Sequence, residues 1–385
     1  MATVAEPIAL MEDLVVHPPK RLLYGPGPGQ VHPRVYQAMA QPIVGHLDPY
    51  FFQISTEIQH LLRTVFGTRN EMTFVISATG SGGMETAISN FVEQGTKVAA
   101  FANGFFCDRQ TEMARRQGGE VVRFEKPWGE VFGGKEAAEF IHREKPQVVT
   151  YVQAETSAGA FQRGDAICQA AHEVGALVIA DCVTSLGAMP VEVDKTGIDI
   201  AYSCSQKGLS CPPGLAPITV SPRAMEWLKA RTTPNRSWYF DIKLVADYLL
   251  QSHRYHHTAS ATMFYALREA LALIEEEGLE NRWERHHQAH LEFVKRIEAL
   301  GLEMLVAPQH RIWNLNTPKV PQGVDDAKVR ATLLKDNGIE IAGGFGPLAG
   351  KVFRVGLMGP LATNESVTHF MHCFESALRG AGYKD

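Results

Sequence analysis

Between about residue 70 and residue 220, short apolar segments of strand length alternate with segments whose apolar residues recur every three or four positions. This alternation is typical of a mostly parallel sheet with helices on both faces, because parallel neighbours need a crossover connection. The pattern predicts an α/β fold with a doubly wound sheet, in which ligands bind beyond the carboxyl ends of the strands. The expected strands are 72–77, 97–102, 148–153, 176–183, 199–204 and 215–221, and the expected helices are 83–93, 107–117, 134–143 and 164–174.

The last third of the chain has a different pattern. Residues 261–301 predict two long helices, with Gly278 after the first and Gly301 after the second, where glycine suits a helix end. Strands near 302–307, 311–316, 339–343 and 352–357 and helices near 325–336 and 364–379 follow. We therefore expect an N-terminal extension (1–22), a large domain (23–277) and a smaller C-terminal α+β domain (278–385).

Charge and composition exclude several classes of protein. Across 385 residues, 37 Lys and Arg stand against 42 Asp and Glu, so no basic surface favours a nucleic acid partner. No apolar run approaches the roughly 18 residues of a membrane span. The acidic start MATVAEPIALMED and the end GYKD predict neither a targeting peptide nor a peroxisomal address, so we expect a cytoplasmic protein. The six cysteines show no metal-like or disulfide spacing, so we expect free thiols.

Two glycine-rich stretches are candidates for ligand contact. The segment from Thr79 through Gly80 and Ser81 joins an expected strand to an expected helix, where free amides and the helix dipole suit a phosphate. The alternative is a tight turn that needs glycine for its backbone. The other stretch, around Gly27, contains prolines that lack amide donors, so it predicts a rigid loop.

An acid and a lysine follow two of the expected strands. Asp181 ends the apolar run ALVIAD, and Lys207 comes shortly after the strand DIAYSC. Taken alone, Asp181 also suits a helix cap or turn, and a lysine is usually a solvated surface charge. Together with the phosphate site, however, they form the three contacts that pyridoxal phosphate needs: an anion site, an acid for the pyridine nitrogen and an amine for a Schiff base.

Several motifs occur in an order and spacing that resemble those of a known family. They are GPGPGQVHP, GHLDP, SATGSGGME, the segment DCVTSLGAMPVEVDKTGIDIAYSCSQKGLSCPPG, YHHT and GKVFRVGLMG. From about residue 20 to 380 the chain resembles the class V, fold-type I aminotransferases, and most closely those acting on alanine or serine with glyoxylate.

The resemblance implies roles in binding pyridoxal phosphate. Lys207 would link the cofactor covalently and move the proton of the substrate Cα, and Asp181 would pair with the pyridine nitrogen. Val183 and Phe106 would lie against the two ring faces, Phe106 in place of the tryptophan of animal enzymes. Ser157 would lie near the phenolic oxygen. Thr79, Gly80, Ser81 and Gln206 match phosphate-binding positions, with Ser81 in place of an animal histidine.

The resemblance also implies substrate contacts and a homodimer. Arg354 would receive the substrate α-carboxylate, which an arginine binds with two parallel hydrogen bonds, and Gly27 and Ser157 would lie beside the substrate. Tyr255 and Thr258 match positions that reach the phosphate in the neighbouring subunit. Histidines 286, 287 and 290 lie on a Glu-, Arg- and Gln-rich helix, which we interpret as a surface rather than a metal site.

The implied activity is transfer of an amino group from L-alanine or L-serine to glyoxylate. One alternative is a related aminotransferase that uses another donor with pyruvate, such as aminoethylphosphonate or pyridoxamine. A second is a lyase or desulfurase, which needs a mobile nucleophilic cysteine that Cys211 and Cys373 do not suit. A third is a cofactor-binding protein without catalysis, which predicts a damaged site.

Overall fold

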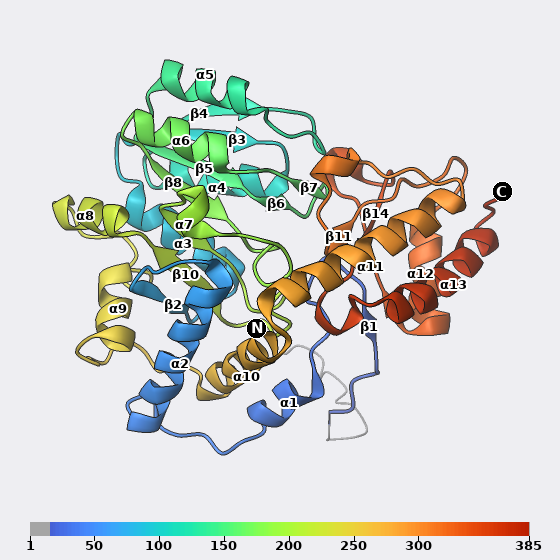
Figure 1. Cartoon of the computed structure of the whole chain (residues 1–385), viewed down its shortest axis with the longest axis horizontal. Helices are drawn as coiled ribbons and strands as arrows, with labels where there is room; N and C mark the ends of the chain where they lie inside the picture. The colour runs from blue at the N-terminus through green and yellow to red at the C-terminus, as the bar shows by residue number, and fades with distance from the viewer. Residues whose placement is uncertain (1–15, 385) are drawn as a thin grey trace, which may run out of the picture.

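A seven-stranded, mostly parallel sheet forms the centre of the larger part of the molecule (Figure 1). The computed structural model describes residues 16–384. The sheet order is β2-β10-β9-β8-β5-β3-β4, and β10 is antiparallel to both of its neighbours. The α/β class expected from the sequence is confirmed. The strands are β2 (Met72–Ile76), β3 (Lys97–Ala102), β4 (Glu120–Glu125), β5 (Val148–Val152), β8 (Leu177–Asp181), β9 (Ile200–Tyr202) and β10 (Ala216–Val220).

Helices cover this sheet so that the central strands β5, β8, β9 and β10 are buried along their whole length. That burial explains why these segments read as continuous apolar runs. The covering helices include α3 (Gly80–Phe91), which packs beside α4 (Phe105–Arg116), and α5 (Gly134–Glu144), which packs beside α6 (Asp165–Glu173). The sequence did not indicate β4, whose residues EVVRFE are charged and partly exposed because it lies at the sheet edge.

Further helices complete the large hydrophobic core. They are α1 (Pro33–Met39), α2 (Pro49–Phe66), the short α7 (Val193–Thr196), α8 (Pro222–Ala230), α9 (Ile242–Leu250) and α10 (Ala261–Glu277). Helix α10 packs against α1 and α2, which links the N-terminal helices to the end of this core. A two-stranded sheet of β6 (Ala154–Glu155) and β7 (Ala160–Phe161) follows β5.

A second hydrophobic core lies in the C-terminal part, coloured orange to red in Figure 1. It is formed by α11 (Leu279–Ala299), α12 (Asp326–Asn337) and α13 (Asn364–Gly380) around a sheet of β11 (Leu315–Asn316), β14 (Phe353–Gly356) and β13 (Ala342–Gly343). Gly278, with a φ of 82°, separates α10 from α11. The strand expected at 302–307 is wrong, since the structure has only an isolated bridge there, from Met304 to Pro318.

The N-terminal segment joins this second core, which the sequence did not indicate. Strand β1 (Leu22–Leu23) pairs with β12 (Ile339–Glu340), and the Tyr24 hydroxyl donates a hydrogen bond to the backbone oxygen of Ser366. Of the extension expected at 1–22, residues 1–15 lie outside the described part. No helix within residues 16–384 is long and apolar enough to cross a membrane. All six cysteines are buried free thiols.

Candidate active site

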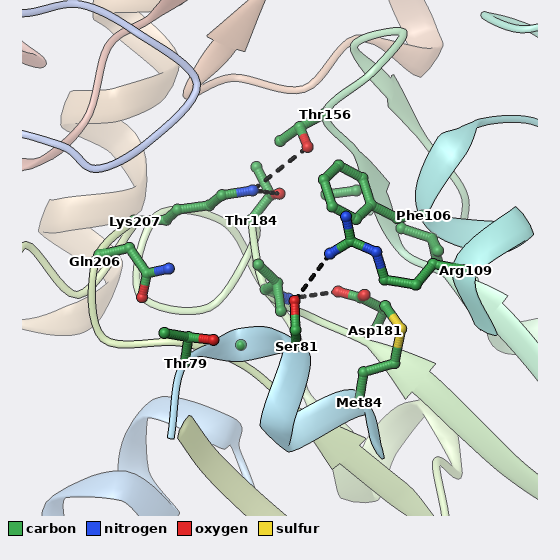
Figure 2. Close-up of a pocket in the computed structure, with 14 residues that line it drawn as sticks. Thr79, Ser81, Met84, Phe106, Arg109, Thr156, Asp181, Thr184, Gln206 and Lys207 are labelled. Atoms are coloured by element: carbon green, nitrogen blue, oxygen red, sulfur yellow. Dashed lines mark hydrogen bonds between the residues drawn. The ribbon is translucent and has the colours of Figure 1, made fainter. Parts of the chain in front are cut away.

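One cavity lies where the carboxyl ends of the parallel strands meet the N-terminus of α3. Its empty space, which includes the part open to solvent, is about 580 Å³. Figure 2 shows that side chains from five separate chain segments point into it. The lining residues are Thr79, Gly80, Ser81, Met84, Phe106, Arg109, Val152, Ala154, Thr156, Asp181, Val183, Thr184, Gln206 and Lys207. Eight of the residues expected from the sequence are therefore brought together: Thr79, Gly80, Ser81, Phe106, Asp181, Val183, Gln206 and Lys207.

Lys207 is a buried amine without a carboxylate partner among the described residues. Its Nζ atom donates to Thr156 Oγ1 at 3.3 Å and to Thr184 Oγ1 at 3.2 Å, and it lies 5.3 Å from the centre of the Phe106 ring. Burial lowers the pKa of this lysine because the charged form loses its hydration. A larger neutral fraction makes the amine a better nucleophile at neutral pH.

Asp181 is a buried carboxylate at the last residue of β8. One oxygen accepts a hydrogen bond from the Val183 amide at 2.8 Å, and the other accepts from the Tyr202 hydroxyl, also at 2.8 Å. Burial raises the pKa of Asp181 to about 6, although these two hydrogen bonds lower it. The side chain is therefore fixed in position without a cation in direct contact.

The raised pKa makes a prediction about the cofactor-free protein. The folded state favours the protonated form of Asp181. The protonated side chain therefore contributes fully to stability below the unfolded-state pKa near 3.8, and this contribution is lost as the pH rises through about 6. Asparagine is neutral throughout. We therefore expect the free energy of unfolding of Asp181→Asn, measured relative to that of the wild type, to rise by roughly 1–2 kcal/mol between pH 5 and pH 8. Thermal unfolding of both proteins at both pH values measures this difference, and the same difference at pH 5 and pH 8 would contradict the prediction.

The opposite end of the cavity suits an anion. Helix α3 begins at Gly80, and its N-cap Thr79 makes no side-chain capping bond, so the positive end of the helix faces the cavity. The Ser81 hydroxyl accepts a hydrogen bond from the Arg109 guanidinium at 2.8 Å. The buried Oε1 atom of Gln206 has no hydrogen-bond partner. This buried acceptor lacks a donor within the described chain, so a polar group from outside the chain is needed to satisfy it.

Arg354 lies on β14, whose neighbouring residues Phe353 and Val355 belong to the second core. Its Nε atom donates to the backbone oxygen of Gly343 at 2.8 Å, and the guanidinium stacks 4.4 Å above the Phe345 ring. Burial lowers the pKa of Arg354 to about 10, and the Glu155 charge opposes this shift. Arg354 makes no salt bridge to a described residue, so its terminal nitrogens remain available to a carboxylate. Gly27 packs on Lys207, since an added Cβ would lie 3.0 Å from Lys207 Cγ.

Five expected site residues do not line this cavity: Arg354 and Gly27, whose contacts are given above, and Ser157, Tyr255 and Thr258. Ser157 is buried, and its hydroxyl donates to Glu155 Oε1 at 2.6 Å while accepting from the Phe105 amide at 3.1 Å. The neighbouring Thr156 lines the cavity in its place. Tyr255 and Thr258 are exposed, with their hydroxyls 3.4 Å apart, and neither contributes to the cavity of its own chain.

Sequence reasoning missed several residues at or beside the cavity, among them Arg109, Thr184, Thr156 and Glu155. Arg109 lies one helical turn after Phe106 on α4, and Thr184 follows Val183, so both positions follow from residues already identified. Thr156 and Glu155 carried no such signal, because their importance depends on how the short β6–β7 turn folds back towards α4.

The surface interpretation of the histidines on α11 is wrong for two of them. His286 and His290 are buried. His286 Nδ1 lies 2.7 Å from the backbone oxygen of Arg282, and His286 Nε2 accepts from the Gly359 amide. His290 Nδ1 lies 2.7 Å from Asn316 Oδ1. The spacing of four residues marks a buried helix face that the surrounding charged residues obscured.

Solved structures align with the chain over almost its whole length. The alanine–glyoxylate aminotransferase of Nostoc sp. superposes with a TM-score of 0.94 at 44% sequence identity, over 97% of this chain and 98% of that one. The ureidoglycine–glyoxylate aminotransferase of Bacillus subtilis has the same TM-score at 37% identity and covers 96% and 95% of the two chains. The fold and the cavity therefore define an enzyme of the aminotransferase type.

The sequence comparisons identify the family. The model of the class V aminotransferases matches residues 30–360. The alanine–glyoxylate aminotransferase of Callithrix jacchus is 37% identical over 380 residues, which are 98% of this chain and 91% of that protein. The chain belongs to the class V aminotransferase family. The family expected from the sequence motifs is confirmed.

Proposed function

We propose that this chain is a pyridoxal-phosphate-dependent transaminase that moves the amino group of a small L-amino acid, alanine or serine, to glyoxylate. Glycine and a 2-oxo acid are the products, formed in two half-reactions at one site. The observation that carries the proposal is a single cavity in which the buried Lys207 amine and the buried Asp181 carboxylate face a free helix N-terminus.

The residues of the cavity suit pyridoxal phosphate. The N-terminus of α3 would hold the phosphate, with the Nε2 amide group of Gln206 as a further donor, and Asp181 would bind the pyridine nitrogen. Phe106 and Val183 supply apolar surfaces for the ring, and Lys207 supplies the amine. When bound, the cofactor withdraws electrons from the substrate Cα–H bond and carries the amino group between the half-reactions.

The protein side chains move and hold protons around this chemistry. Lys207 would accept the proton of the substrate Cα and return it on the opposite half-reaction, and Thr156 and Thr184 hold its Nζ atom by hydrogen bonds. Asp181 would keep the pyridine nitrogen protonated, and the Tyr202 hydroxyl holds this carboxylate in place by a hydrogen bond. Burial of these groups keeps competing water away from the amine.

Donor and acceptor would bind through the same arginine. Both substrates carry an α-carboxylate, for which the free nitrogens of Arg354 are a two-pronged donor. Similar proteins are named for glyoxylate as acceptor with either alanine or ureidoglycine as donor. Their shared acceptor supports glyoxylate as the acceptor of this chain. Their donors differ, so they do not support one particular donor. A desulfurase is disfavoured because none of the buried cysteines lines the cavity.

A steady-state assay tests the proposal. The purified protein is supplied with pyridoxal phosphate, one donor and either glyoxylate or pyruvate, and both products are quantified. We expect glycine and pyruvate to form in equal amounts from alanine and glyoxylate. Turnover only with pyruvate as acceptor, or release of ammonia without glycine, would contradict the proposed function.

We also propose a homodimer whose active sites are shared. Tyr255 and Thr258 are exposed and lie outside their own cavity, which is consistent with contact to a second subunit. If they serve the neighbouring site, Lys207→Ala and a Tyr255→Ala/Thr258→Ala variant will complement each other. One site of each mixed dimer then has all residues intact. We expect co-refolded subunits to regain about a quarter of wild-type activity. No recovery in confirmed mixed dimers would contradict a shared site.

A further inference from the structure

Glu155 is a fully buried carboxylate beside the cavity, and the proposed mechanism gives it no task. It lies at the end of β6, and its two oxygens receive hydrogen bonds from two different elements. Oε1 accepts from the amide of Ser157 at 2.9 Å and from the Ser157 hydroxyl at 2.6 Å. Oε2 accepts from the amide of Phe106 at 3.0 Å, and the Cys107 thiol lies 3.7 Å away.

This carboxylate caps a helix to which it does not belong. Helix α4 begins at Phe105, and its N-cap Gly104 has no side chain to accept the free amides of the first turn. Glu155 accepts the Phe106 amide, and the Ser157 hydroxyl accepts the Phe105 amide. A negative charge at this end also interacts favourably with the helix dipole. The glutamate therefore fixes the turn that carries the aromatic ring into the cavity.

The packing around Gly104 shows how close this approach is. A Cβ atom added at position 104 would lie 2.2 Å from Glu155 Cγ and 2.7 Å from Oε2. The φ of Gly104 is −178°, which any residue adopts, so the missing side chain rather than the backbone conformation is what the site requires. Glycine at this position leaves room for the carboxylate to reach the first turn of α4.

Resting on the proposed function, we propose that Glu155 is a positioning residue that sets the Phe106 ring against the cofactor and holds Ser157 away from it. It acts through these two neighbours rather than by touching the reacting atoms. Its charge also interacts electrostatically with Asp181, Lys207 and Arg354, three of the ionisable groups at or near the cavity. One carboxylate thus links the ring-facing aromatic to the groups that bind cofactor and substrate.

Two variants disturb this contact from opposite sides. Glu155→Gln keeps the size of the side chain but replaces an acceptor by a donor, which leaves either the Phe106 amide or the Ser157 donors unpaired. Gly104→Ala leaves the carboxylate intact and displaces it sterically. The matched control is Glu136→Gln, because Glu136 also accepts a backbone amide at a helix N-terminus, that of Gly133 at the start of its own helix α5, and does not line the cavity.

Three readouts are compared with the wild type: the Kd of pyridoxal phosphate for the cofactor-free protein, the visible circular dichroism of the bound cofactor, and kcat/KM for alanine. We expect both Glu155→Gln and Gly104→Ala to raise the Kd and lower kcat/KM by at least about tenfold and to change the visible spectrum. The control will match the wild type in all three. Glu155→Asp, which keeps the charge but shortens the reach, will give an intermediate loss and serves if Glu155→Gln does not fold.

A purely structural glutamate gives a different pattern. Variants that melt at lower temperature but keep the wild-type Kd, circular dichroism and kcat/KM within about twofold would overturn the positioning proposal. The wild-type protein in the same titration keeps the two proposals distinct. If it does not bind pyridoxal phosphate or transfer the amino group of alanine to glyoxylate, the proposed function itself is wrong.

Discussion

Replacing Lys207 by alanine will lower kcat by at least about 10⁴-fold, because one substitution removes both the amine that binds the cofactor and the base that moves the Cα proton. The fold will persist. The side chain is buried but makes only two hydrogen bonds, both with hydroxyls, Thr156 and Thr184, that are able to bind water in its place. Single-turnover kinetics with alanine measure the loss.

Lys229→Ala is the matched control, since Lys229 is exposed on α8 and pairs only with Glu226. We expect that variant to keep wild-type activity. A Lys207→Ala protein that still transfers the amino group at a comparable rate would show that another group moves the proton. Added methylamine offers a further check, because a small amine that enters the vacated space should restore part of the activity if the lysine acts as a base.

Removing the Arg354 guanidinium will weaken binding of both substrates. We expect Arg354→Ala to weaken the binding free energy of alanine and of glyoxylate by about 2–4 kcal/mol. This loss corresponds to a rise in KM of roughly 30-fold to 900-fold. The physical reason is the loss of a partly desolvated, two-pronged contact to the α-carboxylate. Binding of pyridoxal phosphate will change little, because Arg354 does not line the part of the cavity assigned to the cofactor.

Two further variants refine this result. Arg354→Lys keeps the charge but not the planar pair of donors, so we expect it to recover only part of the lost affinity. Arg330→Ala, which breaks the pair with Asp326 on α12 in the same part of the molecule, controls for a change in stability. Unchanged KM values for both substrates in Arg354→Ala would remove this residue from the site.

The sequence predicted the fold well where burial is uniform. Strands such as β8 and β9 are buried on both faces and read as unbroken apolar runs, so their positions and the α/β class followed directly. Strand β4 was not predicted, because an edge strand retains charged residues and so lacks a continuous apolar run. The pairing of Leu22–Leu23 with Ile339–Glu340 joins segments more than three hundred positions apart, and nothing local to either segment encodes that contact.

The site was predicted where function follows from position on a strand end. Asp181 ends β8, Lys207 lies in the loop after β9, and the glycine-rich turn stands before a helix, so sheet topology brings them into one cavity. Glu155 and Arg109 depend on the packing of α4 against its neighbours, which the sequence does not display. Ser157 was expected beside the cofactor because of its position in the motif, but its hydroxyl donates a hydrogen bond to Glu155 within the fold.

The visible absorbance spectrum of the protein reconstituted with pyridoxal phosphate tests the central claim most directly. Alanine is added first and glyoxylate second, each under single-turnover conditions. The account predicts that alanine removes the band of the lysine-bound cofactor, with release of pyruvate, and that glyoxylate restores the band, with release of glycine. No such band after reconstitution, or a band that alanine and serine both leave unchanged, would contradict it.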